Sequence, residues 1–148
     1  MTDRSRTIPA DIRVSVADPA DIDVIHEIAS YLKSEIEHSR PGLKHQNVVL
    51  LAHDADDQLI GGVIGVINWS WFLIHVVWVA GHERGKGIGS ALIKAAEEEA
   101  RRQGCDRAHL STHDFQAPAF YSRLGYSIFS VWDDYPAGSK MFHMKKPL

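Results

Sequence analysis

Cysteine is almost absent from this chain, since Cys105 is the one thiol in 148 residues. A lone cysteine excludes an internal disulfide framework and is typical of a reducing compartment, so we expect a cytoplasmic protein. An excess of positive charge is missing as well, because 16 Lys and Arg stand against 19 Asp and Glu, for a formal net charge of -3. We therefore expect no nucleic-acid partner and no anionic membrane surface as a partner.

Long apolar runs are also lacking. The longest, from Trp69 to Ala80, is interrupted by Ser70 and His75 and is too short to cross a bilayer. No apolar segment follows the charged amino terminus, so we expect no signal peptide. The length and the 45% hydrophobic content fit a single domain over residues 1–148, with a polar tail at residues 1–10.

Hydrophobic periodicity predicts a mixed α/β chain, with strands where apolar residues alternate and helices where they recur at three and four. The predicted strands cover residues 12–16, 47–53, 59–67, 72–79, 106–111, 126–132 and 141–145. The predicted helices begin at Pro19 (with Asp18 as N-cap), near Ile88 and at Pro118. Short connections between residues 47 and 79 require antiparallel pairing. Three glycines in the second of these strands indicate a bulge or a close approach of another part of the chain to its backbone.

The most informative segment is Arg84-Gly85-Lys86-Gly87-Ile88-Gly89-Ser90, which lies between a predicted strand and a predicted helix. Alternate glycines let the backbone approach a ligand, and the helix start adds unpaired N–H groups and the positive end of its dipole. With the charges of Arg84 and Lys86, this pattern predicts a phosphate site. The alternative is a tight strand-to-helix turn without a ligand.

Two familiar nucleotide motifs do not fit this segment. A P-loop requires G-x-x-x-x-G-K-[ST], and Gly81 lies one residue too close to Gly85-Lys86. A dinucleotide fingerprint requires G-x-G-x-x-G, and here Gly89 comes one position early. The antiparallel strands predicted upstream also disagree with a doubly wound fold.

The pattern that does fit is R-x-x-G-x-G, from Arg84 to Gly89, followed by A-x-x-x-Y-x-x-x-G-[FY], from Ala117 to Tyr126. In both motifs and in its element order, the chain resembles the GCN5-related N-acetyltransferases over about residues 11–146. The resemblance implies a mixed, mostly antiparallel central sheet of about seven strands flanked by about four helices. It also implies acetyl-CoA as the acyl donor and an amine as the acceptor.

The resemblance implies which residues hold acetyl-CoA. The glycine segment would bind the pyrophosphate, and the end of the strand at residues 72–79 would bind the pantetheine and the thioester carbonyl. The implied residues are Val77, Trp78, Val79, Arg84, Gly85, Lys86, Gly87, Ile88, Gly89, Ser90 and Phe115. Many members carry Asn where this chain has Asp114, which leaves the pantetheine contact at that position open.

Proton transfer needs an acid and a base. The resemblance places the family's acid at Tyr121, whose phenol would protonate the leaving thiolate; the alternative is that this side chain only packs under the last strand. For the base we expect His75, which interrupts an apolar strand and shares a face with Val77 and Val79 if alternation holds. Glu35, Glu37 or water could also serve, and His75 could be a core or interface residue.

The acceptor site is the least determined feature. Candidate residues are Glu35, Trp71 and Asp134, since carboxylates beside aromatic side chains suit a cationic amine. No metal is expected, because His109 and His113 lie about 13 Å apart on a strand. An open sheet edge and exposed tryptophans would permit a homodimer. A non-catalytic acyl-CoA-binding sensor on the same scaffold remains the alternative function.

Overall fold

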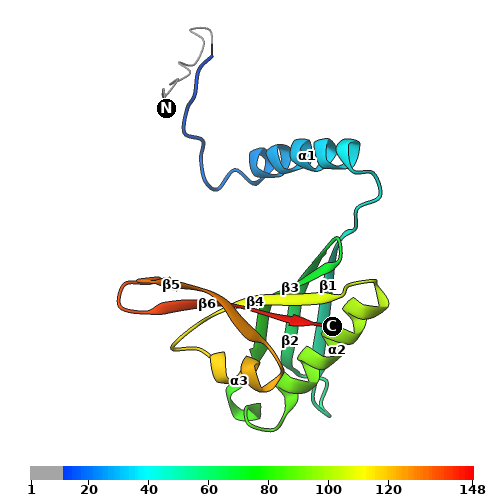
Figure 1. Ribbon diagram of the computed structural model, residues 1–148, viewed down its shortest axis with the longest axis vertical. Coiled ribbons are helices and arrows are strands. Elements are labelled where there is room, and N and C mark those ends of the chain that lie inside the picture. The colour runs from blue at the N-terminus through cyan, green and yellow to red at the C-terminus, as the bar shows by residue number, and fades with distance from the viewer. Residues whose placement is uncertain (1–11) are drawn as a thin grey trace. The chain divides into compact units, whose positions relative to one another are not determined.

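The computed structural model describes residues 12–148, so the expected tail at residues 1–10 lies outside the described residues. The chain divides after Gly42 into two compact units, which are described separately below. The elements labelled in Figure 1 are α1 (Ile22–Ser39), β1 (His45–His53), β2 (Leu59–Asn68), β3 (Trp71–Val79), α2 (Ile88–Arg102), β4 (Arg107–His113), α3 (Pro118–Arg123), β5 (Ser127–Asp133) and β6 (Lys140–Pro147), with a 3₁₀ turn at Gly81–Glu83. No helix in the described range is long and apolar enough to cross a membrane.

The first unit contains α1, which begins three residues later than predicted. Its N-cap is Asp21, whose side chain accepts a hydrogen bond from the Val24 N–H at 3.2 Å. Asp18 and Pro19 instead form a turn closed by the Asp21 N–H and the Asp18 carbonyl at 3.1 Å. Proline at the second position of a turn satisfies the same φ preference as proline at the start of a helix, so the dipeptide fits either structure.

The predicted strand at residues 12–16 is wrong. Its apolar side chains alternate, but Ile12, Val14 and Val16 are exposed and no strand within residues 12–148 pairs with this segment. Alternation describes which side chains share a face, whereas a strand also needs a neighbour for its N–H and C=O groups. The sheet consequently has six strands rather than about seven, and the described chain has three α-helices rather than about four.

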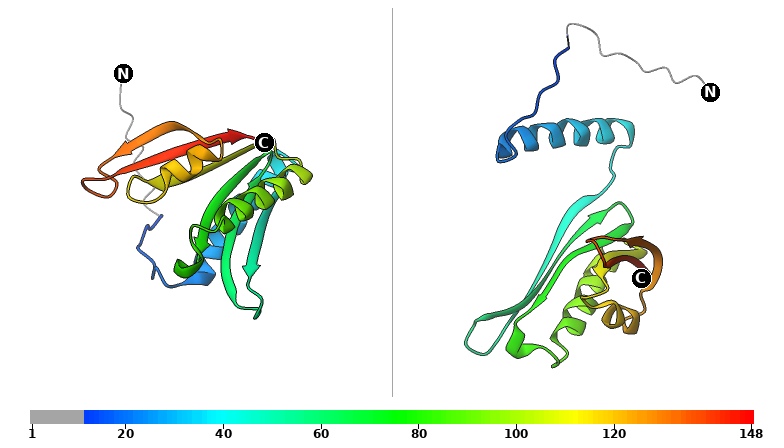
Figure 2. Two further views of the ribbon diagram at one scale, coloured as in Figure 1. Left: turned by 90° about the horizontal axis from the view of Figure 1, so that it is seen from below. Right: turned by 90° about the vertical axis from the view of Figure 1, so that its left-hand side faces the viewer.

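The second unit is built on one sheet with the strand order β1-β2-β3-β4-β6-β5. The predicted meander is confirmed, since β1, β2 and β3 pair antiparallel in sequence. β4 then joins β3 in parallel, and β6 pairs antiparallel with both β4 and β5 (Figure 2). A mostly antiparallel mixed sheet is confirmed, and α2 packs across β1, β2 and β3.

The core lies between α2 and this sheet. Leu92, Ile93, Ala96 and Ala100 form the apolar stripe of α2, and all four are buried in one cluster with Phe72 and other strand residues. Cys105 is also buried there. The register between β2 and β3 shifts between Ile64 and Gly65, but the extra residue of this bulge lies on β3 and not on the glycine-bearing β2. The close approach is confirmed at Gly65, where an added Cβ would overlap the Phe72 ring.

A buried carboxylate, Glu97 on α2, links three elements of this unit. Its oxygens accept hydrogen bonds from the Tyr126 hydroxyl and the Lys146 ammonium, each at 2.8 Å, and Arg101 lies 3.8 Å away. A carboxylate this deeply buried is stable only with such partners, because desolvation of an unpaired charge is costly.

Replacing Glu97 with Ala should therefore lower the free energy of unfolding by about 3 kcal/mol, since Lys146 would lose its counter-charge in a largely buried position. Urea unfolding followed by circular dichroism measures the change. Glu98→Ala is the control, because Glu98 is an exposed neighbour, and it should alter stability by less than about 0.5 kcal/mol. Equal effects of the two substitutions would contradict a stabilising role for the Glu97 contacts.

Candidate active site

The parallel strands β3 and β4 separate soon after they meet. They pair at Trp71/Arg107, Phe72/Ala108 and Leu73/His109, and no later pair joins them in the described chain. β4 continues beside β6 as far as His113, while residues 74–79 of β3 keep only β2 as a neighbour. The splay leaves backbone N–H and C=O groups of β3 facing an opening, where an extended ligand could pair with them as an added strand.

A groove of about 780 Å³ lies at this opening. It is bounded by the end of β3, by the glycine segment before α2, and by α3 with the loop that precedes it. The lining residues are Val77, Trp78, Val79, Glu83, Arg84, Gly85, Gly87, Ile88, Gly89, Ser90, Phe115, Gln116, Ala117, Phe120, Tyr121 and Arg123. The structure thus gathers into one groove every residue expected to bind acetyl-CoA except Lys86.

The glycines of this segment serve two different purposes. Gly85 and Gly87 have φ angles of +78° and +85°, and a Cβ placed on either would meet no described atom within 4 Å. Gly89 instead packs closely, since its Cβ would lie 3.4 Å from the Phe120 ring. Gly87 is the N-cap of α2 and supplies no side-chain hydrogen bond. The unpaired N–H groups in the first turn of α2 therefore follow a glycine, and the space beside this part of the backbone is open to a ligand.

The positively charged residues that line the groove are Arg84 and Arg123, not the predicted pair of Arg84 and Lys86. The Arg84 guanidinium is fixed at the end of β3, where its Nε donates to the Val79 carbonyl at 3.1 Å. Lys86 does not line the groove and forms an ion pair at 3.0 Å with Glu83, which does line it, so the Lys86 charge is offset by that carboxylate. Arg123, at the end of α3, lines the groove and was not predicted. The sequence offered one indication that Arg123 belongs to the site, namely its position two residues after Tyr121 in the second motif.

Tyr121 and Tyr126 lie in the same motif but have different environments. The Tyr126 hydroxyl is occupied by Glu97, and burial together with that carboxylate raises its pKa. Tyr121 lines the groove, is half-buried against Phe120, and its hydroxyl has no hydrogen-bond partner within residues 12–148. Burial raises the pKa of Tyr121 above the usual value of about 10, so the phenol is protonated at neutral pH.

The expected shared face of His75, Val77 and Val79 is wrong. Ile64 pairs with Val76 while the next residue of β2 pairs with Ile74, so His75 is an extra residue in a β-bulge. After the bulge Val77 and Val79 pack toward the core, whereas His75 is exposed and does not line the groove. A bulge reverses the alternation that the sequence pattern assumes.

Of the residues expected at the acceptor site, Trp71 and Asp134 belong to the second unit, and neither lines the groove. Trp71 packs edge-on against His109 at 5.5 Å and under Arg107, away from the groove lining. Asp134 has a φ of +55° and accepts a hydrogen bond from the Gly138 N–H at 3.2 Å. Glu35 lies on α1, in the separately described unit.

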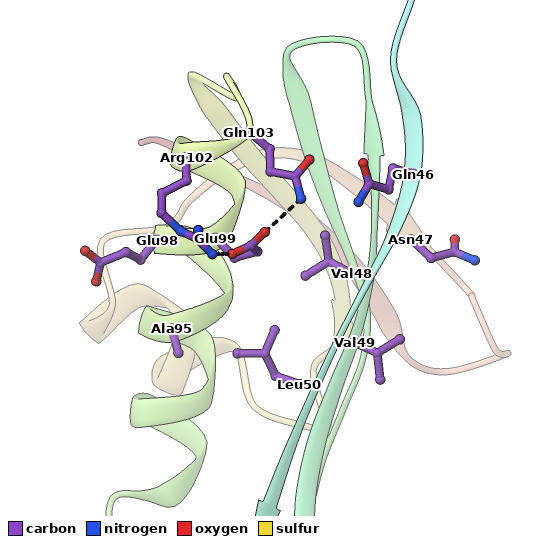
Figure 3. Close-up of a pocket in the computed structure, with 10 residues that line it drawn as sticks. All are labelled: Gln46, Asn47, Val48, Val49, Leu50, Ala95, Glu98, Glu99, Arg102 and Gln103. Carbon is purple, nitrogen blue, oxygen red and sulfur yellow. Dashed lines mark hydrogen bonds and ion pairs between the residues drawn. The ribbon is translucent and has the colours of Figure 1, made fainter.

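A second hollow, of about 510 Å³, lies between β1 and α2 (Figure 3). Three of its polar side chains contact one another, since Glu99 pairs with Arg102 and accepts from Gln103 Nε2 at 2.7 Å. It contains neither the glycine segment nor a tyrosine. Within residues 12–148 no three His, Cys, Asp or Glu side chains come together as metal ligands would.

Fold and groove together define a class of α+β proteins in which a glycine-rich helix start faces the opening between two splayed parallel strands. The chain belongs to the Acetyltransferase (GNAT) family, whose model matches residues 20–126. The family resemblance carried by Arg84–Gly89 and Ala117–Tyr126 is thereby confirmed.

Similar proteins include a blasticidin-S acetyltransferase from Streptomyces morookaense, 44% identical over 82 residues that make up 55% of this chain. The chain spans about 60% of the length of that relative. A solved acetyltransferase from Bacillus cereus is 26% identical, with a TM-score of 0.77 over 91% of this chain and 98% of that one. An aminoglycoside 6'-N-acetyltransferase complexed with coenzyme A is 20% identical, with a TM-score of 0.64 over 85% and 84% of the two chains, and shows the shared fold.

Proposed function

We propose that this protein transfers an acetyl group from acetyl-CoA to a primary amine of a small molecule or a protein, by direct attack within a ternary complex. The groove carries the proposal: an open helix start, two arginines and a half-buried tyrosine lie beside the splay of β3 and β4. Acetyl-CoA supplies the thioester whose acetyl group is transferred. Coenzyme A in a structural neighbour supports the same ligand here.

Each part of the groove has a task in this proposal. The backbone N–H groups from Gly87 to Ser90, with Arg84 and Arg123, bind the pyrophosphate. The unpaired edge of β3 at residues 74–79 binds the pantetheine amides as an added strand, which orients the thioester. A backbone N–H at Trp78 or Val79 donates to the carbonyl oxygen, where negative charge develops during attack.

Proton transfer completes the reaction. The nitrogen–carbon bond forms as the carbon–sulfur bond breaks, the Tyr121 hydroxyl gives its proton to the departing sulfur, and the acceptor gives up a proton to a base. His75 lies on the splayed part of β3 but on the face away from Val77 and Val79. It can serve as that base for an acceptor entering from its own face, and Glu35, Glu37 and water are the other candidates.

The direct test is an assay with purified protein, acetyl-CoA and a panel of amines that includes blasticidin-S, the substrate named for the similar Streptomyces protein. Release of free thiol, together with product gaining one acetyl group by mass spectrometry, is the expected result. Binding of coenzyme A without transfer to any amine would contradict the enzymatic proposal and favour an acyl-CoA sensor.

The pH dependence follows from the position of Tyr121. The phenol donates only while protonated, and burial raises its pKa, so the protonated form persists at least to the usual value of about 10 and is lost above it. We expect kcat to show no alkaline decrease from this group below about pH 10. An alkaline decrease near pH 8 that disappears in Tyr121→Phe would assign a lowered pKa to Tyr121 and contradict the burial argument.

A further inference from the structure

Two exposed aromatic rings form a corner at the end of β5. Trp132 and Tyr135 lie edge to face, with ring centroids 5.5 Å apart and ring planes at 89°. Their exposed fractions are 49% and 50%, although large aromatic side chains contribute most to stability when buried. Contiguous exposed apolar side chains are a feature of binding surfaces.

A histidine supports each ring of the corner. His113 is parallel to Tyr135 at 6.0 Å, and His143 contacts Trp132 at 4.6 Å. His143 is itself held, because its Nδ1 hydrogen-bonds with the Ser111 hydroxyl at 2.9 Å. Its buried Nε2 has no hydrogen-bond partner among the described residues. The two rings are therefore positioned before any ligand arrives, which lowers the cost of binding.

The corner is continuous with the groove. Phe115 lines the groove and stacks on His113 at 4.8 Å with planes 14° apart, and His113 in turn is parallel to Tyr135. A ligand long enough to extend past His113 can thus reach the corner while its reacting atom lies in the groove.

The loops beside the corner carry excess negative charge. Lys140 is ion-paired with Asp133, and its backbone N–H donates to Asp114 Oδ2 at 3.1 Å. Asp134 lies close enough to contribute to the electrostatic field at the same ammonium. Asp133 thus pairs with the Lys140 ammonium and Asp114 with its backbone N–H, and Asp114 directly precedes Phe115 at the groove. This charge is complementary to an ammonium group placed between the corner and the groove.

From this arrangement we propose that the acceptor is a cationic amine that carries a flat aromatic or heteroaromatic ring, which stacks in the Trp132–Tyr135 corner while its amine lies in the groove. The inference rests on the proposed acetyl transfer and specifies its acceptor. A ring in this corner would stack on one side chain and meet the other edge to face, the two geometries that aromatic pairs prefer.

The test compares two acceptors of similar size, 6-phenylhexylamine and 6-cyclohexylhexylamine, whose linkers are long enough to pass His113, in the acetyl-transfer assay. We expect kcat/KM to favour the aromatic amine by about tenfold, because each aromatic pair contributes binding free energy beyond that of the apolar area it buries. Trp132→Leu and Tyr135→Leu keep apolar bulk but remove the flat ring, and each should reduce the preference to about twofold. Trp69→Leu, at an exposed tryptophan in the β2–β3 turn, is the matched control and should retain the preference.

A binding measurement separates failure of this inference from failure of the proposed function. In the presence of coenzyme A, 6-phenylhexylamine should shift the NMR resonance of the Trp132 indole N–H, assigned by its loss in Trp132→Leu. That shift without turnover would support the corner as a binding site and contradict acetyl transfer. Turnover with no aromatic preference, or with the preference intact in both corner variants, would overturn the inference. Conversion of a wild-type dimer to monomers by Trp132→Leu would overturn it too, by assigning the corner to an interface between copies.

Discussion

Replacing Gly87 with Glu should abolish detectable binding of acetyl-CoA, a loss of more than about 100-fold, while the chain still folds. The glutamate would place a negative charge at the N-terminus of α2, where the helix dipole and its free N–H groups favour an anion. Its side chain would also occupy the open space beside Gly87, where a Cβ now meets no described atom within 4 Å. Isothermal titration calorimetry with acetyl-CoA measures the loss.

Backbone strain has to be separated from ligand exclusion, because Gly87 has a φ of +85° that non-glycine residues rarely adopt. Gly104→Glu is the matched control: Gly104 has a φ of +92° and equally open surroundings, but lies beyond the other end of α2. It should carry a similar cost in stability and bind acetyl-CoA normally. Wild-type affinity in a folded Gly87→Glu protein would remove the glycine segment from the binding site.

Replacing Tyr121 with Phe should lower kcat by about 100-fold or more, with a much smaller change in the KM for acetyl-CoA. General acid catalysis by a positioned side chain is worth roughly 10² to 10⁴ in rate, and the phenylalanine keeps the ring while removing the donor. Steady-state kinetics at pH 7.5 with a saturating amine measures the effect.

Tyr126→Phe distinguishes loss of chemistry from loss of structure. Tyr126 is five residues away and donates to the buried Glu97 at 2.8 Å, so its substitution should reduce stability by about 1 kcal/mol and leave kcat nearly unchanged. The Tyr121 variant should show the opposite pattern. If Tyr121→Phe acetylates every tested amine at the wild-type rate, the assignment of Tyr121 as the acid is wrong.

Local signals in the sequence were sufficient for most of the second unit. Turn residues between short apolar runs predicted the β1-β2-β3 meander. The helix α3 was predicted from Pro118, at its start, and it ends just before Gly125. The glycine segment was informative because its motif and the start of α2 are both encoded by residues adjacent in the sequence. The groove itself could be anticipated only through the family resemblance, since its walls come from strands and a helix separated along the chain.

The predictions that failed concern features that local sequence does not encode. The strand at residues 12–16 needed a neighbouring strand, and periodicity reports nothing about neighbours. His75 was misplaced because a bulge depends on the register between β2 and β3. Lys86 carries charge in the right segment, but its ion pair with Glu83 becomes visible only in three dimensions. The Trp132–Tyr135 corner likewise depends on how the β5–β6 loop folds.

Thermal unfolding with acetyl-CoA, CoA, NADH and ATP in parallel tests the central claim most directly, because it asks which ligand the groove before α2 accepts. A ligand present at 100 times its Kd stabilises a protein by roughly 2.7 kcal/mol, which is a shift of several degrees for a domain of this size. We predict a shift with acetyl-CoA and CoA and none with NADH or ATP. A shift with NADH or ATP, and none with either form of coenzyme A, would contradict the assignment of residues 84–90 as the acetyl-CoA pyrophosphate site.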